Sequence, residues 1–304
     1  MTAHVFATRL ATGRPLLCDG AMGTELFARG LVAGECPERW NLERGETVAE
    51  VSRAYAAAGA EMVETNTFGG SPLKLAAYGL AGRAAEINRR GAELARLGAG
   101  RALIAGSCGP CGDLLEPHGG AARDAVARSF ETQLGALAEG GVDAFCVETM
   151  TDLDEAVLAV RAARRVAPGV PVLASMTFDA TPRGFFTLMG NALADCVRRL
   201  VDEGADVVGA NCGSGIAVMV EVGRALRAAT RAPLVVQANA GLPEQRDGRL
   251  VYTEGPELFA ERARELVEVG VAVIGGCCGT TPDHIAALRA MIDGVPGHAT
   301  RPAP

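Results

Sequence analysis

Short apolar runs alternate with longer amphipathic segments along most of this 304-residue chain. Eight short runs have consecutive apolar residues at their centres, which is typical of strands buried on both faces of a parallel sheet. They occupy residues 16–19, 61–65, 102–106, 144–148, 171–177, 206–211, 234–239 and 271–274. Apolar residues recur at helical spacing in segments 47–58, 84–97, 124–139, 153–167, 192–203, 217–229, 256–269 and 281–292. The pattern therefore predicts strands and helices in regular alternation.

Eight strand–helix units predict an α/β fold, a closed (β/α)8 TIM barrel, because parallel strands joined by right-handed crossovers close at this number. An open doubly wound sheet is the alternative, and it would place a glycine-rich dinucleotide loop after the first strand. Asp19-Gly-Ala-Met-Gly23 lacks the third glycine of that loop. We expect one domain over residues 1–304, with its core at about 14–292 and a frayed tail at 297–304. Segments 29–46, 108–120 and 179–190 are expected to be loops.

Composition and charge narrow the class of protein. Hydrophobic residues make up 49% and charged residues 21% of the chain, as in a globular protein with a substantial core. A net charge of -7 argues against a nucleic-acid partner, which would require clustered basic residues. No run of 18 apolar residues occurs, and the first 14 residues lack the apolar core of a signal peptide. We therefore expect a cytoplasmic protein whose nine cysteines are reduced thiols.

Polar residues stand where the predicted strands end. In a barrel of this kind, catalytic residues lie just past the carboxyl ends of the strands. The residues at those positions are Asp19, Thr65, Asn66, Ser107, Glu148, Thr177, Asn211, Cys212, Asn239, Cys277 and Cys278.

Three cysteines in this set suggest a metal site. Cys277 and Cys278 lie between glycines, and a turn there lets both sulfurs face one point. Cys212 ends the sixth strand, which is separated from the eighth by one strand, or roughly 10 Å of barrel rim at about 4.8 Å per strand. Three thiolates with one open position are typical of catalytic zinc. Asn239, on the intervening strand, is the candidate fourth ligand in the absence of substrate.

Cys108-Gly-Pro-Cys111 is a second cysteine motif whose spacing suits zinc or a redox disulfide. Redox motifs of this spacing normally open a helix in a thioredoxin-type unit, and no such unit is evident around it. A turn after the third strand is the favoured interpretation. The four histidines show no metal-ligand spacing.

Four motifs together resemble the homocysteine S-methyltransferase family. They are Asp19-Gly-Ala-Met-Gly-Thr-Glu25, Glu64-Thr-Asn-Thr-Phe68, Asn211-Cys-Gly213 and Gly275-Gly-Cys-Cys-Gly-Thr-Thr281. The resemblance covers about residues 14 to 292, and the homocysteine-binding barrel of cobalamin-dependent methionine synthase is the most similar member. It implies a methyltransferase that makes methionine from homocysteine.

The resemblance also implies roles for individual residues. Cys212, Cys277 and Cys278 would bind zinc, and the homocysteine thiol would take the open position. Asp19 and Glu148 match positions that hold the substrate ammonium, and these five residues form the expected catalytic set. The backbone from Ala21 through Met22 to Gly23 would receive the carboxylate, a task suited to N–H groups in a glycine turn. Thr65, Asn66 and Asn211 are the remaining expected substrate residues, and Met22 also belongs to the pocket wall.

The methyl donor stays open at this point. Methylcobalamin with methyltetrahydrofolate, S-methylmethionine and S-adenosylmethionine all fit the family. Betaine is disfavoured because aromatic residues make up only 4% of the chain and aromatic cages normally hold quaternary ammonium groups. Gly69 and Thr149 also stand where betaine-using members look aromatic.

Partners and acceptor are open as well. A chain of this length leaves no room for folate and cobalamin domains, so a separate corrinoid protein or further methionine-synthase modules are candidate partners. One alternative is a homocysteine-binding module that acts only with that corrinoid protein. Another is a metal-dependent lyase or hydrolase, which would require histidine or carboxylate ligands. A selenium analogue could replace homocysteine as acceptor.

Overall fold

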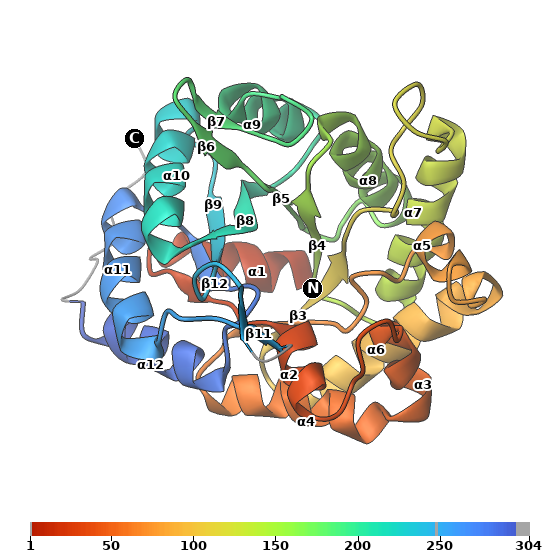
Figure 1. Cartoon of the computed structure of the whole chain (residues 1–304), viewed down its shortest axis with the longest axis horizontal. Coiled ribbons are helices and arrows are strands. Elements are labelled where there is room, and N and C mark those ends of the chain that lie inside the picture. The colour runs from red at the N-terminus through yellow and green to blue at the C-terminus, as the bar shows by residue number, and fades with distance from the viewer. Residues whose placement is uncertain (1, 247–248, 296–304) are drawn as a thin grey trace.

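A parallel eight-stranded sheet lies at the centre of the molecule (Figure 1). The computed structural model describes residues 2–246 and 249–295, so the predicted tail at 297–304 lies outside the described residues. The central strands are β1 (Leu16–Leu17), β2 (Met62–Glu64), β3 (Leu103–Cys108), β4 (Ala144–Met150), β5 (Val172–Met176), β8 (Val207–Gly215), β9 (Leu234–Asn239) and β12 (Val273–Gly276). Their order is β1-β12-β9-β8-β5-β4-β3-β2. A parallel bridge between Cys18 and Met62 joins the two ends of the sheet, which confirms the predicted (β/α)8 barrel.

Long helices surround the barrel and cover its outer face (Figure 1). They are α4 (Gly45–Ala57), α6 (Ala84–Ala99), α7 (Arg123–Glu139), α8 (Leu153–Val166), α9 (Leu193–Asp202), α10 (Ile216–Ala229), α11 (Pro256–Val269) and α12 (Pro282–Asp293). Each begins within about three residues of a helical segment that the sequence predicts. None of the described helices combines the length and the apolar character needed to cross a bilayer.

The core has two layers because successive strand residues point to opposite faces. Side chains directed outward pack against the helices in one large apolar cluster. Side chains directed inward fill the barrel itself, as in other closed eight-stranded barrels. The inner cluster contains Leu16, Cys18, Met62, Ala105, Ala144, Cys146, Leu173, Val207, Val235 and Val273, together with Phe6. The barrel is therefore a packed core whose open end is the carboxyl end of its strands.

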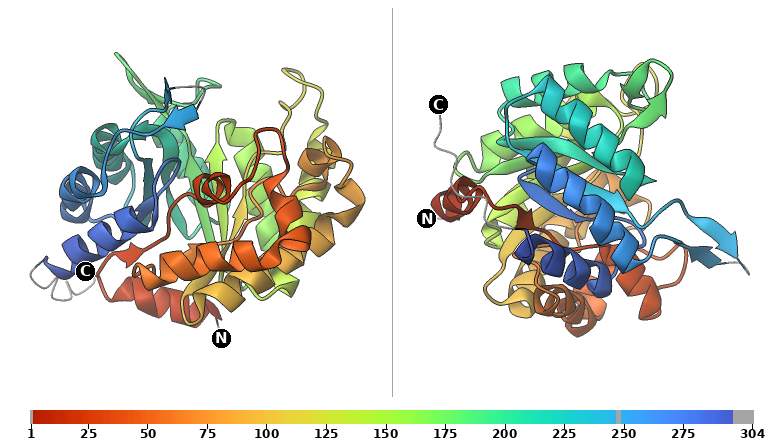
Figure 2. Two further views of the ribbon diagram at one scale, coloured as in Figure 1. Left: turned by 60° about the horizontal axis from the view of Figure 1, so that its bottom comes forward. Right: turned by 90° about the vertical axis from the view of Figure 1, so that its left-hand side faces the viewer.

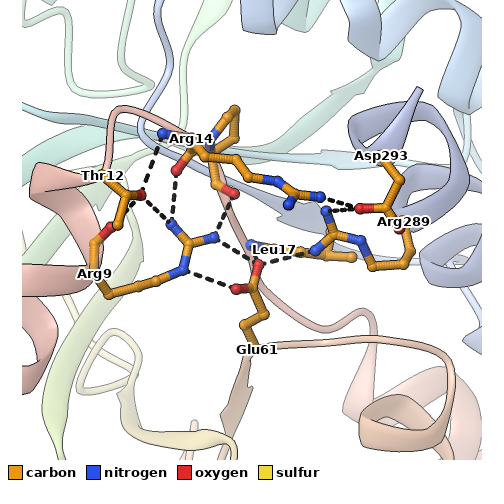
Figure 3. A network of polar contacts seen from close by, with 8 residues as sticks. Arg9, Thr12, Arg14, Leu17, Glu61, Arg289 and Asp293 are labelled. Atoms are coloured by element: carbon orange, nitrogen blue, oxygen red, sulfur yellow. Dashed lines mark hydrogen bonds and ion pairs between the residues drawn. The ribbon is translucent and has the colours of Figure 1, made fainter. Parts of the chain in front are cut away.

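Helix α1 (Thr2–Ala11) lies at the other end of the barrel and supplies Phe6 to its interior. Figure 3 shows the polar network that joins this helix to its neighbours. Arg9 donates to both carboxylate oxygens of Glu61, at 2.8 and 2.7 Å. Arg289 on α12 donates to the same carboxylate at 3.0 Å. This network ties α1 and α12 to the start of β2, far from the strands' carboxyl ends.

Two of the three predicted loops contain regular structure, so the loop prediction was wrong there. Segment 29–46 includes η1 (Pro37–Arg39) and α3 (Trp40–Glu43), and segment 179–190 includes the hairpin β6 (Asp179–Thr181) and β7 (Gly184–Phe186). All three residues of β6 are exposed, so this strand carries no apolar periodicity that the sequence could reveal. A second hairpin, β10 (Glu244–Arg246) and β11 (Arg249–Val251), follows β9. Figure 2 shows both hairpins at the end of the barrel opposite α1.

Further short elements also lie between the strands and the long helices. They are α2 (Met22–Ala28), α5 (Pro72–Ala76) and η2 (Ala81–Arg83).

Candidate active site

Three cysteine sulfurs meet at the carboxyl end of the barrel. The sheet order places β8 and β12 on either side of β9, so Cys212 and the pair Cys277 and Cys278 approach one another across one strand. The three Sγ atoms all lie within 4.8 Å of one another, and Cys212 Sγ is 3.9 Å from Cys278 Sγ. All three residues are partly exposed and line a cavity of about 250 Å³. The cavity size suits a small molecule such as an amino acid.

Cys212 has a backbone conformation that few residues adopt. Its φ is +61° and that of Gly213 is +73°, and the pairing of β8 with β9 shifts register between Asn211 and Gly215. A left-handed conformation at a residue with a side chain costs about 1–3 kcal/mol and is found mostly at functional sites. The surrounding contacts therefore hold Cys212 in a turn that its own backbone disfavours.

Hydrogen bonds among the sulfurs concentrate negative charge at Cys212. Bonds from Cys277 and then Cys278 lower the pKa of Cys212 to about 3. Cys278 and Cys277 are each hydrogen-bonded to Cys212, and these bonds raise the pKa of Cys278 to about 11 and raise the pKa of Cys277 as well. One thiolate and two polarised thiols form a soft, electron-rich donor set, which is the kind of set that zinc prefers.

Asn239 supplies a fourth group beside the sulfurs. Its side chain is hydrogen-bonded to Cys212, it is 4% exposed, and its Oδ1 is a buried oxygen without a hydrogen-bond partner. Buried polar atoms without partners are rare in native structures and often indicate a ligand. Three sulfurs with this amide group next to Cys212 match the four-coordinate preference of zinc. The donor set thus fits a zinc ion.

Three carboxyl groups lie next to this site: Asp19 follows β1, the partly buried Glu64 ends β2, and Glu148 lies on β4. Asp19 is 1% exposed and Glu148 is 6% exposed, and Glu64 lines the cavity with Glu148. The backbone N–H of Glu64 donates to Asp19 Oδ2 at 2.9 Å. Burial, and then the charge of Glu64, raises the pKa of Asp19 and that of Glu148, and burial also raises the pKa of Glu64. A cluster of this kind favours a bound cation such as an ammonium group.

The first turn of α2 lines the same cavity through Ala21, Met22 and Gly23. The N–H of Ala21 donates to Thr280 Oγ1 at 3.2 Å. The N–H groups of Met22 and Gly23 lie in the first turn, where a helix offers no carbonyl partner of its own. These amides are available to an anionic group at this end of the cavity.

Other predicted site residues are divided between the cavity wall and its surroundings. Thr65 and Asn66 line the cavity, and the Asn66 amide donates to Pro37 O at 2.8 Å. The described residues that line the cavity do not include Asp19 or Asn211. Asn211 is 1% exposed and donates to Glu148 Oε2 at 3.4 Å. Asn211 is therefore linked to the cavity through Glu148, which lines it.

Glu64 is a site residue to which the sequence analysis assigned no role. It belongs to one of the four motifs and is an acidic residue near the carboxyl end of an apolar run, as are Asp19 and Glu148. That shared position was the signal that could have identified it. Its carboxylate accepts from Gln237 Nε2 at 2.9 Å and from Cys146 Sγ at 3.2 Å.

Cys108 and Cys111 do not belong to this cavity. Cys108 Sγ donates to Gln133 Oε1 at 3.3 Å and Cys111 Sγ donates to Asp113 O at 3.4 Å. Both residues are buried; Cys108 is the last residue of β3, and Cys111 lies in the turn after it, as the sequence favoured.

Comparisons with known proteins show the family to which the chain belongs. A family profile described as homocysteine S-methyltransferase matches residues 16–292. Methionine synthase of Mycobacterium tuberculosis is 35% identical over 312 aligned positions, which cover 95% of this chain, and that of Mycobacterium leprae is 34% identical over 92% of this chain. The chain spans 26% and 24% of these two relatives, or about a quarter of their length. The metallated form of the homocysteine methyltransferase MmuM from Escherichia coli has a similar structure, with a TM-score of 0.76 and 27% identity over 91% of this chain and 96% of that one.

Proposed function

Because this chain belongs to the homocysteine S-methyltransferase family, we propose that it transfers a methyl group to the thiol of L-homocysteine and so forms methionine. One observation carries the proposal: three sulfurs within 4.8 Å of one another face a small cavity that is also lined by the carboxyl groups of Glu64 and Glu148. The sulfurs suit a metal that binds a thiol, and the carboxyl groups suit the ammonium of an amino acid. The expected metal site and the expected amino-acid site are adjacent, because the Asn211 side chain contacts both Glu148 and Cys277.

Cys212, Cys277 and Cys278 would hold zinc, with Asn239 as the fourth ligand when no substrate is bound. A free thiol with a pKa of about 8.5 is only about 3% ionised at pH 7. Zinc, when bound, supplies a Lewis acid that keeps the homocysteine sulfur in its nucleophilic thiolate form. This removes a penalty of about 2 kcal/mol in available nucleophile at neutral pH.

The chain itself orients the substrate. Asp19 and Glu148 hold the ammonium, and Asn211 supports Glu148 by donating to its carboxylate at 3.4 Å. The backbone of residues 21–23 receives the carboxylate through amides of the first turn of α2. Thr65 and Asn66 form the wall beside these groups. Fixing both ends of the amino acid directs its thiol toward the cysteine sulfurs.

The methyl donor belongs to one of two classes. The similarity to two methionine synthases favours methylcobalamin, supplied by another domain or by a separate corrinoid protein and regenerated from methyltetrahydrofolate. The similarity to MmuM supports a small sulfonium donor such as S-methylmethionine or S-adenosylmethionine. We include a cytoplasmic location in the proposal, since all nine cysteines are free and reduced thiols suit a reducing compartment.

Metal analysis and a donor panel test the proposal. The purified chain should contain about one zinc, and Cys277→Ala should lose both the metal and methionine formation. Cys196→Ala is the matched control, because Cys196 is buried in α9 outside the cavity. The panel offers homocysteine with S-methylmethionine, S-adenosylmethionine, betaine, or methylcobalamin with and without methyltetrahydrofolate. Full activity without metal would refute the proposal.

The panel also decides between the proposal and its alternatives. Turnover with any small donor by the purified chain alone would exclude a module that only binds homocysteine. Turnover only in the presence of an added corrinoid protein would assign the chain to the methylcobalamin donor class, as the homocysteine-binding module of a larger methyltransferase. A lyase or hydrolase would show product from substrate without any methyl donor.

A further inference from the structure

Residues 252–254, here called the strap, connect the three turns that carry the cysteine sulfurs and Asn239. The strap follows the hairpin of β10 and β11 and precedes α11. It touches the turn after Cys212, the turn after Asn239 and the turn after Cys278, through a different group in each case. We propose that Tyr252 and Glu254 are positioning residues that hold these turns in the arrangement that accepts the metal, an inference that depends on the proposed zinc site.

The first contact is with the turn after Cys212. Helix α10 begins at Ile216, and its N-cap, Gly215, has no side chain to accept the free N–H groups of the first turn. Glu254 Oε2 accepts the N–H of Ile216 at 3.0 Å instead. A Cβ atom on Gly215 would lie 2.3 Å from Glu254 Oε1, so the carboxylate is packed directly against this turn. A negative charge at a helix N-terminus is stabilising, which fixes the carboxylate and the turn together.

The second contact is with the turn after Asn239. The N–H of Glu254 donates to Ala240 O at 3.0 Å, and the N–H of Ala240 donates to Cys278 O at 2.9 Å. These two bonds place the strap, the end of β9 and the last cysteine in one chain of backbone hydrogen bonds.

The third contact is with the turn after Cys278, through two side chains. The N–H of Thr281 donates to His284 Nδ1 at 3.2 Å, so the ring proton is on Nε2, which donates to Glu254 O at 2.9 Å. The Tyr252 ring lies over Gly279, where a Cβ atom would be 2.1 Å from the ring. The Tyr252 hydroxyl is also hydrogen-bonded to the Cys278 sulfur.

These contacts have a consequence for metal binding. Cys212 occupies a left-handed conformation, with a φ of +61°, that must be held by its surroundings. Groups that orient metal ligands typically account for 10- to 100-fold in metal affinity. The strap joins both cysteine-bearing turns to the turn of Asn239. Removing its contacts should therefore weaken zinc binding although all of the zinc ligands remain.

Zinc affinity, measured by competition with a chromogenic chelator, tests the strap. Glu254→Ala and Tyr252→Phe should each lower the affinity by about 10-fold or more, with zinc stoichiometry still reaching one at saturation. Glu254→Gln should lie between Glu254→Ala and the unchanged protein, because an amide oxygen still accepts from Ile216. Glu261→Gln is the control, since it removes an exposed carboxylate of α11.

Two further readouts separate positioning from general stability. The absorption bands of the cobalt-substituted protein should shift in Tyr252→Phe, because the hydroxyl acts on a ligand sulfur. Tyr252→Phe keeps the ring on Gly279, so this variant decides the question even if Glu254→Ala fails to fold. Variants with unchanged zinc affinity would overturn the role of the strap. Failure of the unsubstituted protein to bind zinc would overturn the proposed function instead.

Discussion

The amide of Asn211 holds Thr149 with both of its ends: Oδ1 accepts the Thr149 N–H and Nδ2 donates to Thr149 Oγ1, each at 2.7 Å. Ser175 Oγ donates to the same Oδ1 at 2.7 Å. Thr149 has a φ of +58°, which is an outlier for a β-branched residue. Since Thr149 follows Glu148 and Asn211 precedes Cys212, the pair joins the carboxyl cluster to the sulfurs. The side chain of Asn211 thus fixes the left-handed Thr149 and comes directly before the left-handed Cys212 in the chain.

Replacing the Thr149 hydroxyl should destabilise this connection. Thr149→Val keeps the shape and the branching of the side chain but removes the acceptor for Asn211 Nδ2, which is buried. We expect the free energy of unfolding of the metal-free protein to fall by about 1–2 kcal/mol, because Asn211 Nδ2 loses its short hydrogen bond and keeps only the longer one to Glu148 Oε2. Thr149→Ser retains the hydroxyl and should lose less. Equal stability of Thr149→Val and the unchanged protein in chemical denaturation would contradict this account.

Binding of the amino acid should weaken on acidification at a higher pH than ordinary carboxyl groups predict. Burial, and then the charge of Glu64, raises the pKa of both Asp19 and Glu148. A carboxyl group with a raised pKa becomes neutral as the pH falls through that raised value, and a neutral group no longer attracts an ammonium. Calorimetry with methionine as ligand avoids the titration of the homocysteine thiol. Glu148→Gln should bind weakly and with less pH dependence, and a pH-independent affinity in the unchanged protein would refute the assignment.

Glu64→Gln should move the acid limb of that binding curve to lower pH. The charge of Glu64 is the second cause that raises the pKa of Glu148, after burial, so removing it makes Glu148 easier to ionise. Glutamine preserves the size of the side chain and can still accept from Gln237. The same methionine titration measures the shift. Glu155→Gln is the control, because Glu155 is a buried carboxyl with a raised pKa that does not line the cavity.

The Glu61 network should stabilise the protein at neutral pH and not in acid. Burial opposes ionisation of Glu61, but hydrogen bonds and charge from Arg9, with a further charge from Arg289, outweigh it and lower the pKa of Glu61. A lowered pKa gives stability that is present above the unfolded-state value and is lost as the pH falls through the folded-state value. We expect Glu61→Gln to reduce the free energy of unfolding by about 1–2 kcal/mol at pH 7 and by much less near pH 3.

An exposed ion pair provides the control for Glu61. Glu46 lies 3.4 Å from Arg53, and its side chain is 70% exposed. Exposed pairs contribute about 0–1 kcal/mol, so Glu46→Gln should have little effect at either pH. Denaturant titrations at the two pH values compare the variants. A loss in Glu61→Gln that is the same at both values would argue against the ion pairs as its cause.

Cys108 and Cys111 should react slowly with alkylating reagents in the folded protein. Burial, and then the charge of Glu155, raises the pKa of Cys108 well above its usual range, and burial with a hydrogen bond to Glu155 raises the pKa of Cys111 to about 12. The reactive thiolate is therefore scarce at neutral pH. Iodoacetamide labelling followed by peptide mass analysis should find both residues unmodified until the protein unfolds. Rapid labelling or a Cys108–Cys111 disulfide would restore the redox interpretation of this motif.

The sequence alone predicted the barrel because its signal is local. Eight apolar runs separated by amphipathic segments predict strands and helices wherever packing agrees with periodicity, as it does from residue 16 to residue 292. The topology then places polar strand ends together, so Cys212, Cys277 and Cys278 could be grouped without coordinates. The glycine-flanked cysteine pair was visible for the same reason, since a turn signal is carried by neighbours in the chain.

Only the tertiary structure revealed the groups that hold this site in place. These groups come from different strands and loops. They include the hydrogen bonds between Asn211 and Thr149, the contact between Glu64 and Glu148, and the contacts of the strap. No periodicity marks such contacts, because the distances between loop side chains depend on how the whole barrel closes. The positions of strands and helices along the chain are set by local patterns, whereas the conformation of Cys212 is set by neighbours that meet only after the chain has folded.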